Sequence, residues 1–99
     1  QMMKVRGTTV YPQSIYSALE EINGIDDYYI IVSSETDLSD NINIYVSVKE
    51  NSCDSKIIQN KLQAKLRVKP TVVITSKEKI AQQVYTPESR KPVRFIDRR

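Results

Sequence analysis

Two spacings of hydrophobic residues predict the elements in the first half of the chain. Residues 12–24 carry apolar side chains at the three- and four-residue intervals of one helix face. These positions are Ile15, Ala18, Leu19 and Ile22. Pro12 suits a first helical turn, where its missing N–H would have no partner, and Gly24 is typical of a helix end. We therefore predict a helix between these two residues.

The next segments alternate with period two, which is the spacing of strands. Residues 27–35 are rich in β-branched and aromatic side chains, and residues 41–50 place every second side chain on one apolar face. That face consists of Ile42, Ile44, Val46 and Val48. The polar link at 36–40 suits a tight turn, so we expect the two strands to form an antiparallel hairpin.

A second amphipathic helix is predicted after this hairpin. Ile58, Leu62 and Leu66 recur at four-residue intervals, and Ser52 or Asp54 can cap the first turn. The lysines of this segment lie off the apolar stripe. The helix should therefore have a basic outer face and an apolar underside.

Short segments complete the predicted fold. They are a strand at 4–12 with a kink at Gly7, a buried strand at 71–76, one or two helical turns at 77–83, and a last strand at 93–97. The order strand, helix, strand, strand, helix, strand predicts an α+β protein. We expect a two-layer split βαβ (ferredoxin-like) sandwich, followed by a C-terminal loop and a short strand.

Length and composition narrow the class of protein. The length of 99 residues suits one core, so we expect residues 1–99 to form a single small domain. No run approaches the ~18 consecutive apolar residues of a membrane span, and the N-terminus lacks the apolar core of a signal peptide, so we expect a cytoplasmic protein. Cys53 is the only cysteine and histidine is absent, which excludes a Cys/His zinc site and histidine-based catalysis.

Charge is distributed unevenly. Residues 1–50 hold three cations against eight acids, a net charge of −5, whereas residues 51–99 hold twelve cations against four acids, a net charge of +8. The basic half can attract an anionic partner, or it can simply solvate the surface of a small domain. Tyr45 is the only aromatic residue at 41–48, where no cation occurs, so we do not expect the base stacking of RNA-recognition modules. Acid pairs such as Asp26/Asp27 are interpreted as surface clusters.

Two loops are the candidates for chemistry. The two glycines are too few for a phosphate-binding glycine motif, but Gly7 follows Arg6 near the N-terminus, and Lys91 lies on an irregular segment near the C-terminus. A lysine ammonium suits a position between a nucleotide phosphate and a carboxylate, where charge accumulates during phosphoryl or adenylyl transfer. An exposed lysine of this kind can complete an active site on another domain.

Both ends of the chain resemble one family. The stretch MMKVRGTTVYPQSIYSALEEINGI, which begins at Met2, resembles the segment that opens the C-terminal domain of phenylacetate-CoA ligases, members of the adenylate-forming superfamily. The stretch PESRKPVRFIDRR resembles the closing motif of that family, with Lys91, Arg94, Asp97 and Arg99 in step. The layout between them also fits, so the resemblance covers essentially the whole chain.

The resemblance implies an enzyme with two half-reactions. An aryl or arylacetic carboxylate attacks ATP to give an acyl-adenylate and diphosphate, and CoA then displaces AMP to give the thioester. ATP, Mg²⁺ and most substrate contacts belong to a large N-terminal domain, so this domain alone is expected to bind no cofactor and to be inactive. Its implied partners are the N-terminal adenylation domain, CoA and the acyl-adenylate, and neither a membrane nor a nucleic acid.

The resemblance also assigns roles to residues. In one orientation the domain inserts the catalytic lysine, matched by Lys91, into the adenylation site; in the other it presents a loop beside CoA. That loop is matched by Arg6, Gly7 and Thr8, and the supporting basic residues are Arg90 and Arg94. No metal ligand is implied in this domain.

The neighbours of Lys91 differ from the family pattern. Arg90 and Pro92 flank Lys91 where the family has a glycine and a small residue, so we expect an extended and stiff presentation of the lysine. The alternative interpretation is a free-standing ferredoxin-like module that binds an anionic ligand or RNA with its basic half.

Overall fold

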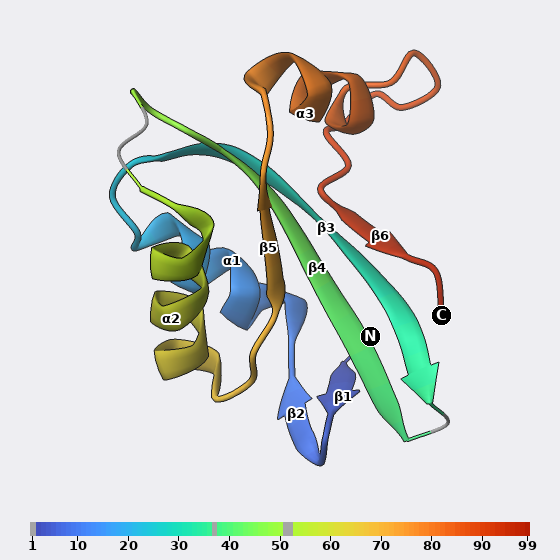
Figure 1. The fold of residues 1–99 in the computed structure, drawn as a ribbon. Coiled ribbons are helices and arrows are strands. Elements are labelled where there is room, and N and C mark those ends of the chain that lie inside the picture. Colours follow the sequence, from blue (N-terminus) through green and yellow to red (C-terminus); the bar gives the residue numbers. More distant parts are fainter. Residues whose placement is uncertain (1, 37, 51–52) are drawn as a thin grey trace.

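The computed structural model describes residues 2–36, 38–50 and 53–99. Within these residues the chain forms two sheets and three helices (Figure 1). The strands are β1 (Met3–Val5), β2 (Thr8–Val10), β3 (Ile25–Thr36), β4 (Ser39–Val48), β5 (Thr71–Ile74) and β6 (Phe95–Asp97), and the helices are α1 (Pro12–Glu20), α2 (Ser55–Leu66) and α3 (Lys77–Val84). The predicted two-layer α+β sandwich is confirmed and is consistent with a ferredoxin-like domain, with a hairpin in place of the first strand.

The β3–β4 hairpin is the centre of the larger sheet, whose strand order is β5-β4-β3-β6. The two strands pair antiparallel from Ile25↔Val48 to Thr36↔Ser39, as predicted. The short strands extend the sheet in parallel, β5 beside β4 and β6 beside β3. Parallel neighbours need a crossover connection, and α2 lies in the one that leads from β4 to β5.

The N-terminal strand lies outside this sheet, whereas a split βαβ arrangement places its first strand inside it. The chain turns back at Arg6 and Gly7, whose φ angles are +50° and +87°, and forms the separate β1–β2 hairpin. Two consecutive residues with positive φ are what a two-residue type I′ turn requires. The predicted kink at Gly7 is therefore a complete chain reversal.

Local chemistry sets the ends of the helices. Pro12 occupies the first turn of α1, as predicted, but the helix ends at Glu20 and not beside Gly24. Asp54 caps α2, because its side chain accepts a hydrogen bond from the Ile57 N–H at 2.8 Å. Ser52, the other predicted cap, lies outside the described residues. Arg67 ends α2 in the left-handed conformation, with a φ of +63°.

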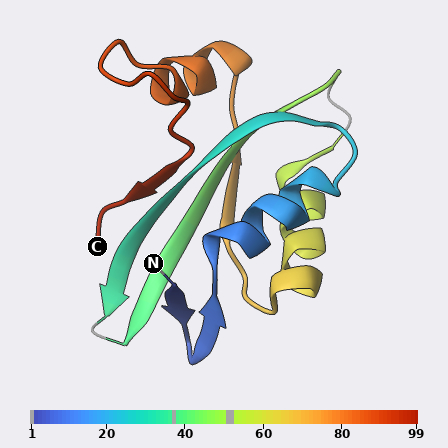
Figure 2. The same ribbon diagram turned by 180° about the vertical axis from the view of Figure 1, so that it is seen from behind.

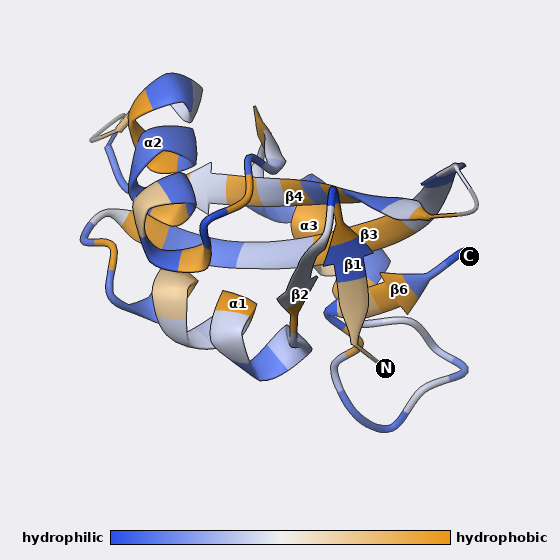
Figure 3. Ribbon diagram, turned by 90° about the horizontal axis from the view of Figure 1, so that it is seen from below, coloured by the Kyte–Doolittle hydropathy of each residue, from blue (hydrophilic) through white to orange (hydrophobic). Residues whose placement is uncertain are grey.

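The core lies between the larger sheet and the helices α1 and α2, which pack on one side of it (Figure 2). Every apolar position predicted for the two helices is buried there, and Figure 3 shows the hydrophobic and hydrophilic bands along α2. The strands contribute Ile30, Val32, Ile42, Ile44 and Val46. Full burial of one such side chain is worth about 1.5–3 kcal/mol, so this packing fixes the frame from which the loops project.

The third helix packs separately. Ile80 and Val84 of α3 are fully buried but lie outside the main core, and the helix contacts β3 and β4. Ser76 caps the helix by accepting a hydrogen bond from the Lys79 N–H at 3.2 Å. The predicted one or two helical turns are thus confirmed, and they hold the start of the loop that leads to β6.

Candidate functional site

The loop that carries Lys91 connects α3 to β6 and is mostly hydrophilic, apart from Val93 near its end (Figure 3). Its two ends are joined by a hydrogen bond from the Val93 N–H to the Val84 C=O, at 3.0 Å. Inside the loop, the Ser89 hydroxyl donates to the Lys91 C=O at 2.6 Å, and the Ser89 N–H donates to the Thr86 C=O at 3.2 Å. These bonds define the loop backbone around an exposed Lys91.

The cationic groups of Lys91 and Arg90 remain available. Both residues are exposed, and neither side chain makes a hydrogen bond or ion pair with another residue of the described chain. By contrast, Lys77 pairs with Asp26 at 3.5 Å between Nζ and Oδ2. The loop therefore presents two unpaired cations at its tip, directly before Pro92.

Arg94 anchors the base of this loop. Its Nε donates to Asp27 Oδ1 at 3.0 Å, and its Nη2 donates to the Tyr85 hydroxyl at 2.9 Å. The guanidinium carbon lies 5.6 Å from the Tyr85 ring centre and 6.0 Å from that of Tyr28, within cation–π range. The backbone also takes part, because the Arg94 C=O accepts a hydrogen bond from the Ile30 N–H at 2.7 Å.

The electrostatics of this anchor favour a permanently charged Arg94. Burial alone would lower the pKa of Arg94, but the hydrogen bonds to Asp27 and Tyr85 raise it above its usual value. The side chain of Asp27 is 17% exposed. The prediction that Asp26 and Asp27 form a surface cluster is therefore wrong for Asp27, because its side chain is mostly buried and pairs with Arg94.

A groove of about 320 Å³ lies beside the same anchor. Tyr16, Tyr28, Pro92 and Arg94 are among the residues that line it. The rings of Tyr16 and Tyr28 lie 6.2 Å apart, and burial raises the pKa of both hydroxyl groups. The groove therefore has an aromatic wall that ends at the Lys91 loop.

The second predicted loop is the turn of the β1–β2 hairpin. Arg6 and Gly7 are its central residues, and Thr8 begins β2. A Cβ built on Gly7 would meet no atom within 4 Å, so the glycine is required for its positive φ and not for lack of space within this domain. Arg6 is exposed and makes no side-chain ion pair within the described residues.

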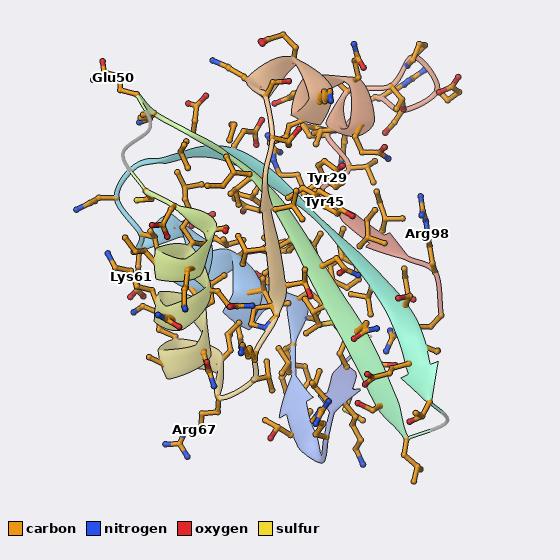
Figure 4. All side chains as sticks on the ribbon, in the orientation of Figure 1. Tyr29, Tyr45, Glu50, Lys61, Arg67 and Arg98 are labelled. Carbon is orange, nitrogen blue, oxygen red and sulfur yellow. The ribbon has the colours of Figure 1, made fainter. Side chains whose placement is uncertain are left out.

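A groove of about 440 Å³ separates this turn from the C-terminal end of α2. Three cations, Arg6, Arg67 and Lys69, line it together with Thr8, and its lining includes no carboxylate. Figure 4 shows Arg67 pointing away from the end of α2. The turn therefore borders a positively charged groove.

The hairpin is attached to the larger sheet through side chains. The Lys4 N–H donates to Asp40 Oδ2 at 3.0 Å, and the Arg6 N–H donates to Ser39 Oγ at 3.2 Å. Arg99 Nη1 donates both to the Met2 C=O at 2.8 Å and to Asp40 Oδ2 at 3.1 Å. The C-terminal residues thus contact the N-terminal hairpin.

The two candidate loops lie at opposite ends of the domain. In Figures 1 and 2, the loop between α3 and β6 is at the upper end of the sheet and the β1–β2 hairpin is at the lower end. The structure does not bring Lys91 and the Arg6–Gly7–Thr8 turn together. One fixed orientation of the domain cannot present both loops to the same place.

Several residues of these arrangements were missed in the sequence. Asp27, Tyr85 and Asp40 hold the loops, and the two aspartates lie far along the chain from the arginines that they contact. The bonds Arg94–Asp27 and Arg99–Asp40 span 67 and 59 positions. The sequence offered one signal for these pairs, the contrast between an acid-rich first half and a basic second half, because both bonds join an acid of the first half to an arginine of the second.

The outer face of the sheet carries a stacked tyrosine pair. The rings of Tyr29 and Tyr45 lie 4.7 Å apart with an interplanar angle of 11° (Figure 4). Each tyrosine therefore already uses one ring face on the other. No helix in the described ranges is long and apolar enough to cross a membrane, and no group of three His, Cys, Asp or Glu residues there could hold a metal ion.

The fold and the two candidate sites define the class of this protein: it is a small α+β domain with two separate exposed loops. The model of the family described as AMP-binding enzyme C-terminal domain matches residues 7–99. The chain belongs to this family, which confirms its predicted place among the adenylate-forming enzymes. A search of the curated proteins found no match.

Solved structures share the fold. A domain of phenylacetate-coenzyme A ligase from Bacteroides vulgatus ATCC 8482 is 21% identical, with a TM-score of 0.67, and the match covers 100% of this chain and 93% of that one. 2-Hydroxyisobutyryl-CoA ligase in the thioesterification state, with 2-HIB-AMP and CoA, is 23% identical with a TM-score of 0.70, over 98% of this chain and 21% of that one. The same ligase in the postadenylation state is 21% identical with a TM-score of 0.73, and the match covers 99% of this chain and 22% of that one. The chain thus spans about a fifth of that ligase.

Proposed function

We propose that this chain is the mobile C-terminal domain of an ATP-dependent phenylacetate-CoA ligase. The full enzyme would convert an arylacetate, ATP and CoA into acyl-CoA, AMP and diphosphate. Membership in the AMP-binding enzyme C-terminal family supports the adenylate-forming class over a free-standing anion- or RNA-binding module. The resemblance of both end motifs to phenylacetate-CoA ligases supports an arylacetate as the acid substrate. We expect the enzyme to be cytoplasmic.

The unpaired Lys91 on an anchored loop is the observation that carries this proposal. In the first half-reaction, a carboxylate oxygen of the acid attacks the α-phosphorus of ATP, and diphosphate leaves. The Lys91 ammonium is suited to neutralise the charge shared by the carboxylate and the α-phosphate. Arg90 adds positive charge beside it, and Arg94 acts from the base of the loop, where Asp27 and Tyr85 hold it.

The hairpin turn is proposed to serve the second half-reaction. The CoA thiol sulfur attacks the acyl carbon of the acyl-adenylate, AMP leaves, and the thiol proton is released. Arg6, Gly7 and Thr8 would lie beside the CoA arm, next to a groove with two further cations. Because this turn and Lys91 lie at opposite ends of the domain, the domain must change orientation between the two steps.

The remaining parts of the reaction are assigned to the rest of the enzyme. We propose that the N-terminal adenylation domain binds ATP, Mg²⁺ and the aryl acid, and that this chain alone is inactive. The acyl-adenylate and CoA would contact this chain only in the assembled enzyme. Residues outside this domain would therefore determine which acid is accepted.

Substitution of Lys91 in the full-length enzyme tests the proposal. Lys91→Ala should slow acyl-adenylate formation by roughly 10²–10³-fold, the scale of one lost transition-state charge partner. Transfer of the acyl group from preformed acyl-adenylate to CoA should change far less. Lys79→Ala is a matched control, because Lys79 is an exposed lysine on α3 outside the loop. Equal loss of both half-reactions in the Lys91 variant would contradict the assignment.

A further inference from the structure

The outer edge of β1 is satisfied by side chains instead of another strand. In β1, Met3 and Val5 pair with Val10 and Thr8 of β2. Backbone groups in an antiparallel pair point alternately toward and away from the partner strand, so residues 2, 4 and 6 present theirs to the free edge. Each of these three residues has a side-chain partner. The Met2 C=O accepts a hydrogen bond from Arg99. The Lys4 N–H donates to Asp40, and the Arg6 N–H donates to Ser39.

Arg99 is the centre of this arrangement. Asp97 holds its guanidinium at two points, with Nε–Oδ1 at 2.9 Å and Nη2–Oδ2 at 2.7 Å. Nη1 remains for the Met2 C=O and for Asp40. The side chains of Arg99 and Asp40 are 22% and 15% exposed, and the bonds between charged partners are stronger than those between neutral groups. The C-terminal tail thereby orients one cation that contacts both the hairpin and the start of β4.

This attachment determines where the hairpin turn points. Among the residues that the structure describes, the β1–β2 sheet makes no strand ladder with the larger sheet. The buried side chains of Met3 and Val10 fasten it to the core, but apolar contact is not directional. The directional bonds come from Arg99, Asp40 and Ser39, and Arg6 lies only two residues beyond Lys4.

We propose that Arg99 and Asp40 are positioning residues for the thioester-forming half-reaction, because they fix the orientation of the Arg6–Gly7–Thr8 turn. The inference rests on the function proposed above for this turn. Under this proposal, two arginines of the closing motif have different roles. Arg94 holds the loop of Lys91 at one end of the domain, whereas Arg99 holds the hairpin at the other end.

Hydrogen exchange in the intact ligase tests the structural part without any assay of activity. Mass spectrometry would follow the peptide that spans residues 2–8. Arg99→Gln removes the cation, and Asp40→Asn removes the negative charge but keeps an oxygen for the Lys4 N–H. We expect roughly tenfold faster exchange of this peptide in Arg99→Gln and a smaller increase in Asp40→Asn. Arg98→Gln is the matched control, because it removes an equal charge from the neighbouring residue.

Separate assays of the half-reactions test the functional part. In Arg99→Gln, acyl transfer from preformed acyl-adenylate to CoA should slow by roughly 10–100-fold, the range expected for a misplaced active-site group. Acyl-adenylate formation should stay close to that of the unsubstituted enzyme. Arg99→Lys should recover part of the loss, because an ammonium can pair with Asp40 but cannot also hold Asp97 at two points. The double variant Arg99→Gln/Asp40→Asn should be only slightly slower than Arg99→Gln, since the Arg99–Asp40 contact is already lost and Asp40→Asn keeps an oxygen for the Lys4 N–H.

The possible outcomes are distinct. Unchanged exchange in Arg99→Gln would overturn the proposed attachment. Faster exchange combined with equal losses in both half-reactions, or with none, would overturn the positioning role. If the unsubstituted full-length protein forms no acyl-adenylate and no thioester, the proposed function itself fails, and the exchange experiment still reports on the attachment.

Discussion

Arg94 Nε lies 3.0 Å from Asp27 Oδ1, and this bond joins the end of the Lys91 loop to the second residue after the start of β3. The same guanidinium holds the hydroxyl of Tyr85, which lies at the other end of the loop. The two ends of the loop are thus tied together by one guanidinium, which a partly buried carboxylate holds in place. The loop behaves as a closed unit whose tip carries the lysine.

This relationship predicts that Arg94 acts through the placement of Lys91. Arg94→Ala in the full-length enzyme should slow acyl-adenylate formation by roughly 10–100-fold, as expected when a catalytic group is displaced. Arg94→Lys should remain impaired, because an ammonium cannot make the same pair of planar contacts. Rapid-quench measurement of acyl-adenylate formation checks this prediction.

Acyl transfer to CoA provides the internal comparison for the same variant. The loop lies at the far end of the domain from the hairpin turn, so transfer from preformed acyl-adenylate should be nearly retained. A thioester step that falls as much as adenylation would mean that Arg94 supports the whole domain and not the loop. Circular dichroism and thermal unfolding would show whether the variant is folded.

The helical core makes a second prediction. Leu62 on α2 is fully buried in the main core, so Leu62→Ala should lower the free energy of unfolding by about 2–5 kcal/mol. This is a large part of the 5–15 kcal/mol typical of whole domains. Lys61→Ala, at the exposed neighbouring position, should change it by less than about 0.5 kcal/mol. Urea denaturation measures both values, and similar losses in the two variants would contradict the assigned helix face.

The sequence predicted elements well where one periodicity dominated. The apolar stripes of α1 and α2, the β3–β4 hairpin and the Asp54 cap follow from residues close together in the chain, and the structure confirms them. The N-terminal strand was different. The β-branched residues at 4–12 predicted a strand, but such a pattern carries no information about whether a strand joins the main sheet or turns back on itself.

The candidate sites were predictable only in part. Family resemblance indicated Lys91 and the Arg6–Gly7–Thr8 turn, and the structure places both on exposed loops. The residues that hold them were hidden, because Asp27 and Asp40 are common acids that become partners only when β3 and β4 bring them to Arg94 and Arg99. Long-range ion pairs leave no local spacing in a sequence.

The ion pair of the C-terminal tail makes a pH-dependent prediction. The hydrogen bonds from Arg99 lower the pKa of Asp97 from 3.8 to about 2, and they raise the pKa of Arg99. A carboxyl group with a lowered pKa stabilises the folded state above its unfolded pKa, and this contribution is lost as the pH falls through the folded pKa. The attachment of the tail should therefore weaken between about pH 4 and pH 2.

Carboxyl-carbon NMR titration of Asp97 measures this effect directly. Arg99→Gln should raise the pKa of Asp97 toward 3.8, because the hydrogen bonds that lower it are removed. Arg98→Gln should leave the titration of Asp97 nearly unchanged, since Arg98 is not among the causes of the shift. An ordinary titration of Asp97 in the unsubstituted protein would show that the tail does not hold Arg99 in solution.

Gly7 offers a test of backbone conformation without steric crowding. A Cβ at this position meets no atom within 4 Å, but the φ angle of +87° is one that L side chains rarely adopt. Gly7→Ala should therefore cost about 1–2 kcal/mol of folding free energy through backbone strain alone. Gly7→Asn should cost less, because asparagine tolerates positive φ better than alanine. Chemical denaturation of the two variants measures the difference, and an alanine variant as stable as the unsubstituted protein would show that the turn can adopt another conformation at no cost.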